Sequence, residues 1–375
     1  MKRLLLIVLV AAMFVIAGCA DGTGTDDDGT PVETDDDLED AESNGDEDDT
    51  TVNEDETDSE ATNEPEADDS DPGDAPDVNG ELEIHHIDVG QADATLLIEP
   101  SGETMLIDSG DWRQGGSGVI EYLETQDVDR IDHLVATHGH ADHIGGHDAI
   151  IEHYETERDG IGIAYDSGVA HTSQTYDRYL DAIEEHDVEL LVVEEGDHFE
   201  FGDANVDVLN PPVGDSGSDL HANSVALGIE FGEFSYLTTG DAEADAEQRM
   251  VDEHSDQLEA DAYQAGHHGS TTSSTAPFVD QVTPEVVIIS SAYDSQYGHP
   301  HDEVLEDFAD RGIETYWTAV HGDVVLTTDG SDVELETEHE FSTDAADILE
   351  EKPADDDTQA SLTQSIDVAP APLVG

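Results

Sequence analysis

Three histidines and one aspartate lie within six residues of each other at positions 138 to 143. The segment reads His-Gly-His-Ala-Asp-His and directly follows an apolar run, residues 131–136. Neutral imidazole and carboxylate are the ligands that zinc, manganese and iron prefer. Positions 138 and 140 share one face of an extended turn, and 142 and 143 begin a predicted helix, so one loop could serve two adjacent cations. The alternative, a His-rich surface loop, fits this spacing at a strand end less well.

Three further polar clusters also follow apolar, strand-like runs. One is the tight turn Thr239-Gly240-Asp241, and the others contain the histidine pair 267/268 and the run Gly298-His299-Pro300-His301. We expect these strand ends, although distant in sequence, to converge on the 138–143 segment and hold a pair of cations around one activated water.

The sequence between the clusters predicts the elements that must position them. Apolar runs and helical patterns alternate, with glycine in the turns. The predicted strands cover residues 82–89, 94–99, 104–107, 131–136, 189–193, 206–209, 225–231, 234–238, 260–265, 286–291, 314–317 and 323–328. The predicted helices follow residue 143 and cover 174–186, 243–253, 276–282 and 302–311. This alternation predicts one α/β domain of four layers, with two sheets flanked by helices.

Acidic side chains dominate the composition. The 375 residues include 96 Asp and Glu against 9 Lys and Arg, which gives a formal net charge of −87. Residues 21–80 hold 27 of the acids and no basic residue, so the remainder of the chain is itself acidic. Self-repulsion on this scale opposes compaction in dilute buffer, whereas molar salt shortens the Debye length to about 3 Å and screens it. The composition therefore indicates adaptation to a hypersaline environment.

The N-terminus has the pattern of a targeting segment. Lys2 and Arg3 precede an apolar run, residues 4–17, that is too short to cross about 30 Å of hydrocarbon and fits a signal-peptide core. Residues 16–19 resemble a lipobox. Cys19 is the one cysteine of the chain, so it can form neither an internal disulfide nor a thiolate cluster. We expect a lipoprotein signal peptide at residues 1–18 and a lipid anchor on Cys19 at the extracellular face of the membrane.

Two segments outside the predicted domain have compositions typical of disorder. Residues 19–80 nearly lack large apolar side chains and are predicted to be an acidic linker. The catalytic domain is predicted at residues 81–340, and residues 341–375 are predicted to be a disordered acidic tail. No apolar run of membrane-spanning length follows the signal.

The order of the polar clusters resembles that of the metallo-β-lactamase superfamily: His-x-His-x-Asp-His, then Gly-Asp, then a later histidine. Four phrases are most similar to the extracellular domain of ComEC-type competence proteins: residues 87–93, 106–110, 267–270 and 298–300. The resemblance covers about residues 82–330. It implies a four-layer αββα fold of two mixed sheets flanked by helices. It also implies a metal-dependent nuclease that acts on the non-transported DNA strand during uptake.

The matching positions imply a site for two divalent metal ions. His138 and His140 would bind the first ion, and Asp241 would bridge the two. A hydroxide held between the ions would be the nucleophile near neutral pH. Zinc or manganese is favoured, and iron suits the same donors. No nucleotide-binding motif is present, so no nucleotide cofactor is expected.

The second ion would be bound by Asp142, His143 and one histidine of the 267/268 pair. His267 is favoured because it lies nearest the strand end, and His268 is the alternative. Asp142 and Asp241 would thus belong to the catalytic set. His299 would complete that set by donating to the substrate oxyanion or leaving group, unless it only packs at a helix start.

Supporting residues are predicted around the ligands. Asp88 and Asp108 would orient ligand imidazoles. Many relatives supply a third histidine to the first metal, shortly before the Gly-Asp pair; here the region reads Leu-His-Ala-Asn-Ser from position 220. His221 lies near the expected register, and Asn223 belongs to the ComEC-like phrase. His221 is therefore an alternative ligand, without which the first site would be weak, water-completed or empty.

The sequence thus favours an extracellular, lipid-anchored dinuclear metallohydrolase, a ComEC-like phosphodiesterase or nuclease with nucleic acid as substrate. DNA-binding proteins normally gain affinity from Lys and Arg, and only six Arg and one Lys follow residue 80. One alternative is hydrolysis of a small ester, lactone or phosphate. Another is a metal-stabilised binding domain without catalysis. Trp112 and Tyr122 are expected to pack in the fold rather than stack on bases.

Overall fold

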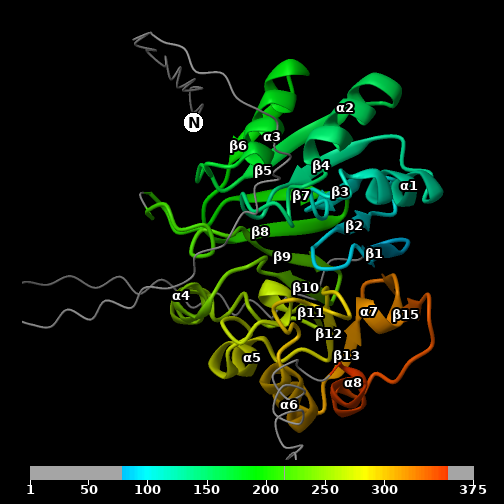
Figure 1. The fold of residues 1–375 in the computed structure, drawn as a ribbon, viewed down its shortest axis with the longest axis vertical. Helices are drawn as coiled ribbons and strands as arrows, with labels where there is room; N and C mark the ends of the chain where they lie inside the picture. Colours follow the sequence, from blue (N-terminus) through cyan, green and yellow to red (C-terminus); the bar gives the residue numbers. More distant parts are fainter. Residues whose placement is uncertain (1–77, 215, 354–375) are drawn as a thin grey trace, which may run out of the picture. The chain divides into compact units, whose positions relative to one another are not determined.

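Two β-sheets pack face to face in the computed structural model, which describes residues 78–214 and 216–353 (Figure 1). The predicted signal peptide, Cys19 and nearly all of the predicted linker lie outside the described residues, as does the end of the predicted tail. No helix in the described ranges is long and apolar enough to cross a membrane.

The first sheet contains eight strands and is mixed. Its order is β15 (Val333–Thr337), β14 (Val324–Thr328), β1 (Leu82–His86), β2 (Thr95–Ile98), β3 (Thr104–Ile107), β4 (Ile131–Val135), β5 (Ile161–Asp166) and β6 (Glu189–Val192). Neighbours from β15 to β3 pair antiparallel, and those from β3 to β6 pair parallel. The carboxyl ends of β3 and β4 therefore lie at the same edge, and the 138–143 segment follows β4.

The second sheet contains seven strands and is also mixed. Its order is β13 (Glu314–Trp317), β12 (Val286–Ile289), β11 (Ala262–Gln264), β10 (Phe234–Thr238), β9 (Ala226–Phe231), β8 (Ala204–Asn210) and β7 (His198–Phe201). Strands β10 to β13 run parallel. All four residues of β12 are apolar and buried, as expected for a parallel strand covered on both faces. The polar clusters after β10, β11 and β12 consequently share one edge.

Helices cover the outer face of each sheet, which completes four layers. In Figure 1 the helices near the first sheet lie at the top and those near the second sheet at the bottom. The first group is α1 (Ser117–Thr125), α2 (His147–Glu157) and α3 (Gln174–Glu185). The second is α4 (Ala244–His254), α5 (Ala276–Val282), α6 (Asp302–Arg311), α7 (Thr318–His321) and α8 (Ala345–Glu351). One apolar core fills the space between the sheets, and one lies under each helical layer.

The structure corrects two of the sequence-based boundaries. The segment from residue 341 was expected to be disordered, yet α8 forms there because Ala345 and Ile348 bury apolar surface against the second sheet's helical layer. The Asp344 carboxylate caps that helix by accepting the amide proton of Ala346 at 2.9 Å. In addition, residues 142 and 143 form a turn, and α2 begins only at His147.

Candidate metal centre

Backbone hydrogen bonds fix the donor loop, residues 138–143, against its neighbours. The amide of Asp93 donates to the Asp142 carbonyl at 3.2 Å, and that of Ser109 donates to the His143 carbonyl at 2.7 Å. The loop ends at Gly145, where an added Cβ would collide with the backbone of Trp112, so glycine allows this close approach. The imidazoles that follow β4 are therefore held in place by the segment before β2 and the segment after β3.

Asp241 lies at the end of β10, directly opposite the donor loop. Its amide donates to the Ser224 hydroxyl at 3.0 Å, and its side chain is only 2% exposed. The preceding Gly240 has φ +51, and a Cβ there would collide with the Ser224 hydroxyl. Glycine thus lets the turn bring this carboxylate into the centre between the two sheets.

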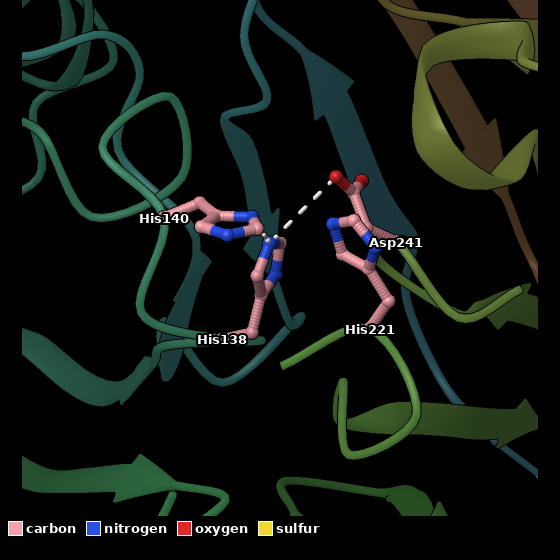
Figure 2. Close-up of side chains that lie close together, drawn as sticks. All are labelled: His138, His140, His221 and Asp241. Carbon is pink, nitrogen blue, oxygen red and sulfur yellow. Dashed lines mark hydrogen bonds and ion pairs between the residues drawn. The ribbon is translucent and has the colours of Figure 1, made fainter. Parts of the chain in front are cut away.

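A first donor group consists of His138, His140, His221 and Asp241, whose ligand atoms all lie within 4.8 Å of one another. Figure 2 shows the four side chains around one common space, with the first two on one side and the others facing them. His138 Nε2 lies 2.8 Å from His140 Nδ1 and 3.6 Å from Asp241 Oδ2. The structure thus brings His221 to the position of a further imidazole donor, although its register in the sequence had left this open.

A second donor group consists of Asp93, His143, Asp241 and His268, all of them buried. His143 Nε2 lies 3.2 Å from Asp241 Oδ1, and His268 Nδ1 lies 3.6 Å from Asp93 Oδ1. Asp142, predicted as a ligand here, is not within this group, but its Oδ2 lies 3.3 Å from His268 Nε2. Asp241 belongs to both groups, so one carboxylate links two adjacent positions.

Buried polar atoms that lack hydrogen bonds indicate that the residues of the second group fit a cation. His143 Nε2, His268 Nε2, Asp93 Oδ1 and Asp241 Oδ1 are buried and make no hydrogen bond of suitable geometry within the described part of the chain, although His143 Nε2 lies 3.2 Å from Asp241 Oδ1. Buried polar atoms are nearly always satisfied, and leaving one unsatisfied costs about 1–3 kcal/mol. Imidazole nitrogen and carboxylate oxygen atoms that converge in this way are the donor set of a divalent transition metal.

The charges of the centre are consistent with bound cations. Burial alone would lower the pKa of His143, but the carboxylates of Asp241 and Asp108 raise it well above its usual value. Burial would raise the pKa of Asp241, yet the neighbouring imidazoles hold it well below its usual range. Burial lowers the pKa of His138 well below its usual value. Anionic carboxylates therefore face imidazoles, and the centre attracts positive charge.

The histidine pair after β11 divides its roles between the two groups. Both residues have positive φ, +50 for His267 and +57 for His268, in the 3-10 turn Gly266–Gly269. This turn places His268, rather than the favoured His267, in the buried second group. His267 Nε2 instead lies 3.6 Å from Asp241 Oδ2, on the side of the first group. Non-glycine residues in the left-handed region are a form of strain often found at functional sites.

Glu243 contacts two of these imidazoles at their Nδ1 atoms. It was not among the site residues predicted from the sequence. Its Oε1 lies 3.4 Å from His221 Nδ1 and 3.5 Å from His267 Nδ1. Hydrogen bonding to these two imidazoles lowers the pKa of Glu243. One carboxylate at the start of α4 therefore links the loop that carries His221 to the turn that carries His267.

The predicted supporting residues have different surroundings. Asp108 Oδ2 accepts the Nδ1 proton of His143 at 2.7 Å, so Asp108 contacts a donor imidazole. Asp88 is exposed, and its carboxylate accepts the amide proton of Gly90 at 3.1 Å rather than that of an imidazole. Asn223 is fully buried and donates to the Asp219 carbonyl at 2.7 Å. It therefore fixes the loop that carries His221 without contacting a donor imidazole.

His299 lies beside the second group. Its ring centroid is 5.7 Å from that of His267 and 6.3 Å from that of His268. The Gln91 amide nitrogen donates to His299 Nδ1 at 3.4 Å, and the Gln91 oxygen accepts from the Ala292 amide at 3.3 Å. This arrangement leaves the imidazole proton on Nε2. Burial and the neighbouring imidazoles lower the pKa of His299 to about 3, so the ring is neutral at pH 7.

Comparison with protein families agrees with the fold and the geometry of the centre. Residues 87–292 match the model of the metallo-beta-lactamase superfamily, which is more than half of the chain. The chain belongs to this superfamily. Its predicted fold class, two mixed sheets flanked by helices in the metallo-beta-lactamase arrangement, is thereby confirmed.

Among metallo-beta-lactamase proteins, the chain is similar to ComEC-type competence proteins, as the sequence phrases had indicated. It is 29% identical over 265 residues to ComE operon protein 3 of Bacillus subtilis (strain 168), covering 66% of this chain and 33% of that protein. It is 28% identical over 236 residues to competence protein ComA of Neisseria gonorrhoeae, covering 63% of this chain and 30% of that protein. The match therefore spans about a third of the length of these curated relatives.

Solved structures with a similar fold are more distant in sequence. CmlA, a diiron beta-hydroxylase from Streptomyces venezuelae, aligns with a TM-score of 0.44 and 17% identity over 66% of this chain and 54% of that chain. The metallo-beta-lactamase fold protein YhfI from Bacillus subtilis aligns with a TM-score of 0.43 and 11% identity over 66% of this chain and 99% of that chain.

Asp93 was missed as a donor by the sequence reasoning, although it closes the phrase 87–93 on which part of the resemblance rests. A carboxylate at the end of that phrase was a usable signal. Glu243 offered a weaker signal, since it stands two residues after Asp241 where acidic residues alternate with alanine. Only the fold reveals that both carboxylates face imidazoles, Asp93 across the two sheets and Glu243 within the second.

Proposed function

We propose that the domain is a hydrolase that holds two divalent ions and cleaves phosphodiester bonds in nucleic acid. The observation that carries the proposal is the sharing of Asp241 between two adjacent donor groups, one of which has buried imidazole nitrogens without hydrogen bonds of suitable geometry in the described part of the chain. Two neighbouring cations of this kind suit in-line displacement at a phosphate. Similarity to competence proteins supports nucleic acid as the source of that phosphate.

The ions would supply an activated water at neutral pH and would neutralise charge on the attacked phosphate. The first ion would be held by His138, His140 and His221, and the shared carboxylate of Asp241 would contact both ions. Zinc and manganese both suit these donors.

The residues around the second position set the protonation of its imidazoles. His143 donates its Nδ1 proton to Asp108, and His268 donates its Nδ1 proton to the Ser290 carbonyl at 3.1 Å. With a cation bound, both imidazoles would therefore present Nε2 without a proton, whereas in its absence the neighbouring carboxylates raise the pKa of both rings above the usual value. Asp93 and Asp241 supply the negative charge that balances a cation there.

His299 would bind the substrate rather than a metal. Because Gln91 donates to its Nδ1, the remaining proton on Nε2 is available to a phosphate oxygen or to the leaving group. As a neutral imidazole at pH 7, His299 would donate a hydrogen bond without adding a positive charge to the site.

We also place the enzyme outside the cell, anchored by lipid on Cys19, because residues 1–19 have the pattern of a lipoprotein signal. A separate membrane protein would then transport any DNA that is taken up. Metabolic labelling with a fatty-acid analogue tests the anchor. The wild-type chain should be labelled and Cys19→Ser should not; equal labelling of both would exclude this anchor.

One observation favours the alternative of a small ester or lactone substrate. Every Arg and Lys side chain that the structure describes forms an ion pair with a carboxylate. Unpaired basic side chains normally supply much of the affinity for a polyanion. High salt reduces this difference, because screening weakens phosphate contacts for all proteins.

A substrate panel distinguishes these functions. Chelator-treated protein is reloaded with zinc or manganese in about 2–4 M salt and incubated with single-stranded DNA, a small phosphodiester and a lactone. We expect phosphodiester cleavage that chelator abolishes and that Asp241→Asn prevents. Lactone turnover without phosphodiester turnover would identify the alternative function. Two bound metal equivalents without any turnover would instead indicate a binding domain.

A further inference from the structure

Trp112 is exposed to solvent on a segment that is hydrogen-bonded to the donor loop. Of the two tryptophans in the chain, Trp317 is completely buried, whereas Trp112 is 47% exposed. The expectation that Trp112 packs in the fold was therefore wrong, while Tyr122 is half-buried and its hydroxyl contacts His85 Nδ1 at 2.9 Å. A large aromatic ring left in water has no stabilising role in the apolar core, so its exposed surface is available to a ligand.

The backbone of Trp112 is attached to the donor loop. Its amide donates to the Ala141 carbonyl at 3.0 Å, and Ala141 lies between His140 and Asp142. A second hydrogen bond joins the same two segments: the Gly145 amide donates to the Gly110 carbonyl at 3.0 Å. The segment that carries the indole is thus fixed at two points, within the donor loop and just after it.

Arg113 extends this exposed feature with a positive charge. Its guanidinium carbon lies 5.1 Å from the centre of the Trp112 ring, and it pairs with Asp111 at 2.9 Å. The Arg113 side chain is 67% exposed, more than that of any other Arg or Lys in the described ranges. In a chain with a net charge of −87, the most open of these cations therefore stands on the segment that is hydrogen-bonded to the donor loop.

We propose that Trp112 and Arg113 form a binding platform for single-stranded nucleic acid, in which a base stacks on the indole and a neighbouring phosphate contacts the guanidinium. This inference rests on the proposed function and names its substrate class. Bases in a duplex are already stacked on one another, so a free ring selects an unpaired strand. Stacking also persists in molar salt, where ion pairing with phosphate is screened.

A second exposed aromatic ring lies beside His299. Tyr297 is 47% exposed, and its ring centroid is 5.7 Å from that of His299. One exposed ring thus stands on the segment that is hydrogen-bonded to the donor loop, and another stands next to His299.

Fluorescence tests the platform without requiring catalysis. Chelator-treated full-length protein in about 2–3 M salt is titrated with a single-stranded oligonucleotide and with the matching duplex. Because Trp317 is buried, we expect the single strand to quench Trp112 emission and to protect it from acrylamide. Trp112→Phe should lose the signal but keep most of the affinity, since phenylalanine still offers a ring. Unchanged emission, or equal quenching by the duplex, would overturn the proposal.

Kinetics of the metal-loaded enzyme provide the second measurement. For Trp112→Ala and Arg113→Ala, we expect kcat/KM for the oligonucleotide to fall about tenfold or more relative to kcat/KM for methyl p-nitrophenyl phosphate. An equal fall for both substrates would assign the two residues a merely structural role. If no phosphodiester is cleaved at all, the proposed function fails, and the fluorescence titration still decides whether the platform binds a strand.

Matched controls replace an aromatic residue and an arginine by alanine away from the metal centre. Phe341 is 36% exposed, and its ring contacts His321 instead of the metal centre. Arg130 precedes β4 and so lies at the opposite end of that strand from the donor loop. Phe341→Ala and Arg130→Ala should leave the ratio of the two kcat/KM values unchanged. A similar fall in either control would show that the effect is not specific to the platform.

Discussion

Asp108 Oδ2 lies 2.7 Å from His143 Nδ1 and accepts its proton, so the opposite nitrogen of His143 is free to face the second donor group. Asp108 has φ +58 and also accepts the amide proton of Thr137 at 2.9 Å, which fixes its orientation. Carboxylates in this position set the tautomer and the direction of a ligand imidazole.

Asp108→Asn should therefore weaken metal binding about 10–100-fold. The amide has one acceptor oxygen in place of two, and it favours the His143 tautomer that carries its proton on Nε2. Titration with a competing chelator measures the affinity. Asp88→Asn is the control, because Asp88 was given the same role from sequence but contacts no donor imidazole in the described structure. Equal losses in both variants would contradict the assignment.

The histidine pair after β11 allows a second prediction, since His268 belongs to the second donor group, whereas His267 contacts Asp241 Oδ2 on the side of the first. His268→Asn should remove one of two metal equivalents, because His268 Nε2 belongs to the buried second group. His267→Asn should retain that equivalent and weaken only the first position. Asparagine is chosen because it tolerates the positive φ of both residues. Metal analysis after gel filtration counts the equivalents, and the reverse pattern would return the role to His267.

Glu243 provides a third prediction, because it holds two imidazoles through one carboxylate. Glu243→Gln should weaken the first metal position about tenfold and leave the second nearly unchanged. Substitution with cobalt makes the two positions distinguishable by their visible spectra. Asp245→Asn is the matched control, since it removes one charge from the same exposed first turn of α4. If both variants behave alike, the effect is one of general charge and not of imidazole orientation.

A fourth prediction concerns the buried carboxyl of Asp166, at the end of β5. Burial raises its pKa from the usual 3.8 to about 6. Between these values the folded protein retains a proton that the unfolded chain has released, so this group's stabilising contribution falls as pH rises toward 6. Asp166→Asn keeps an acceptor for the Gly168 amide and should stabilise the domain by up to about 3 kcal/mol above pH 7.

Chemical denaturation at pH 4 and pH 8 measures this contribution. The gain from Asp166→Asn should appear at pH 8 and vanish at pH 4, where the wild-type carboxyl is already protonated. Asp181→Asn, an exposed change on α3, should show no such pH dependence. A gain of the same size at both pH values would assign the effect to packing instead of ionisation.

Much of the fold could be predicted from sequence because the strands around the centre have distinct patterns. The run 131–136 predicted β4 closely, although Asp132 and His133 interrupt it. The run 286–291 predicted β12, whose continuous apolar residues mark a buried parallel strand. By contrast, β5, β7 and β15 were missed. In β15, which lies at the edge of its sheet, no residue is fully buried and charged residues alternate with apolar ones, so the apolar signal is weak.

The candidate site could be predicted only in part, for a reason of geometry. Residue spacing identifies the donors within one loop, such as His138 and His140, because neighbours in sequence are neighbours in space. The choice between His267 and His268 depends on two left-handed residues in one turn, which no pattern of residue types reveals. The role of Asp93 likewise depends on how β2 and the turn after β11 meet across the two sheets.

The donors of the second group come from both sheets, with Asp93 and His143 on segments of the first and Asp241 and His268 on segments of the second. A cation shared by these four side chains would fasten one half of the sandwich to the other at a single edge. The apolar core between the sheets holds the halves together without the ion, so stripping the ion should loosen this edge locally and leave the rest of the sandwich folded. Because the chain is rich in negative charge, the bound ions would then stabilise the fold at this edge as well as supply the chemistry of the site.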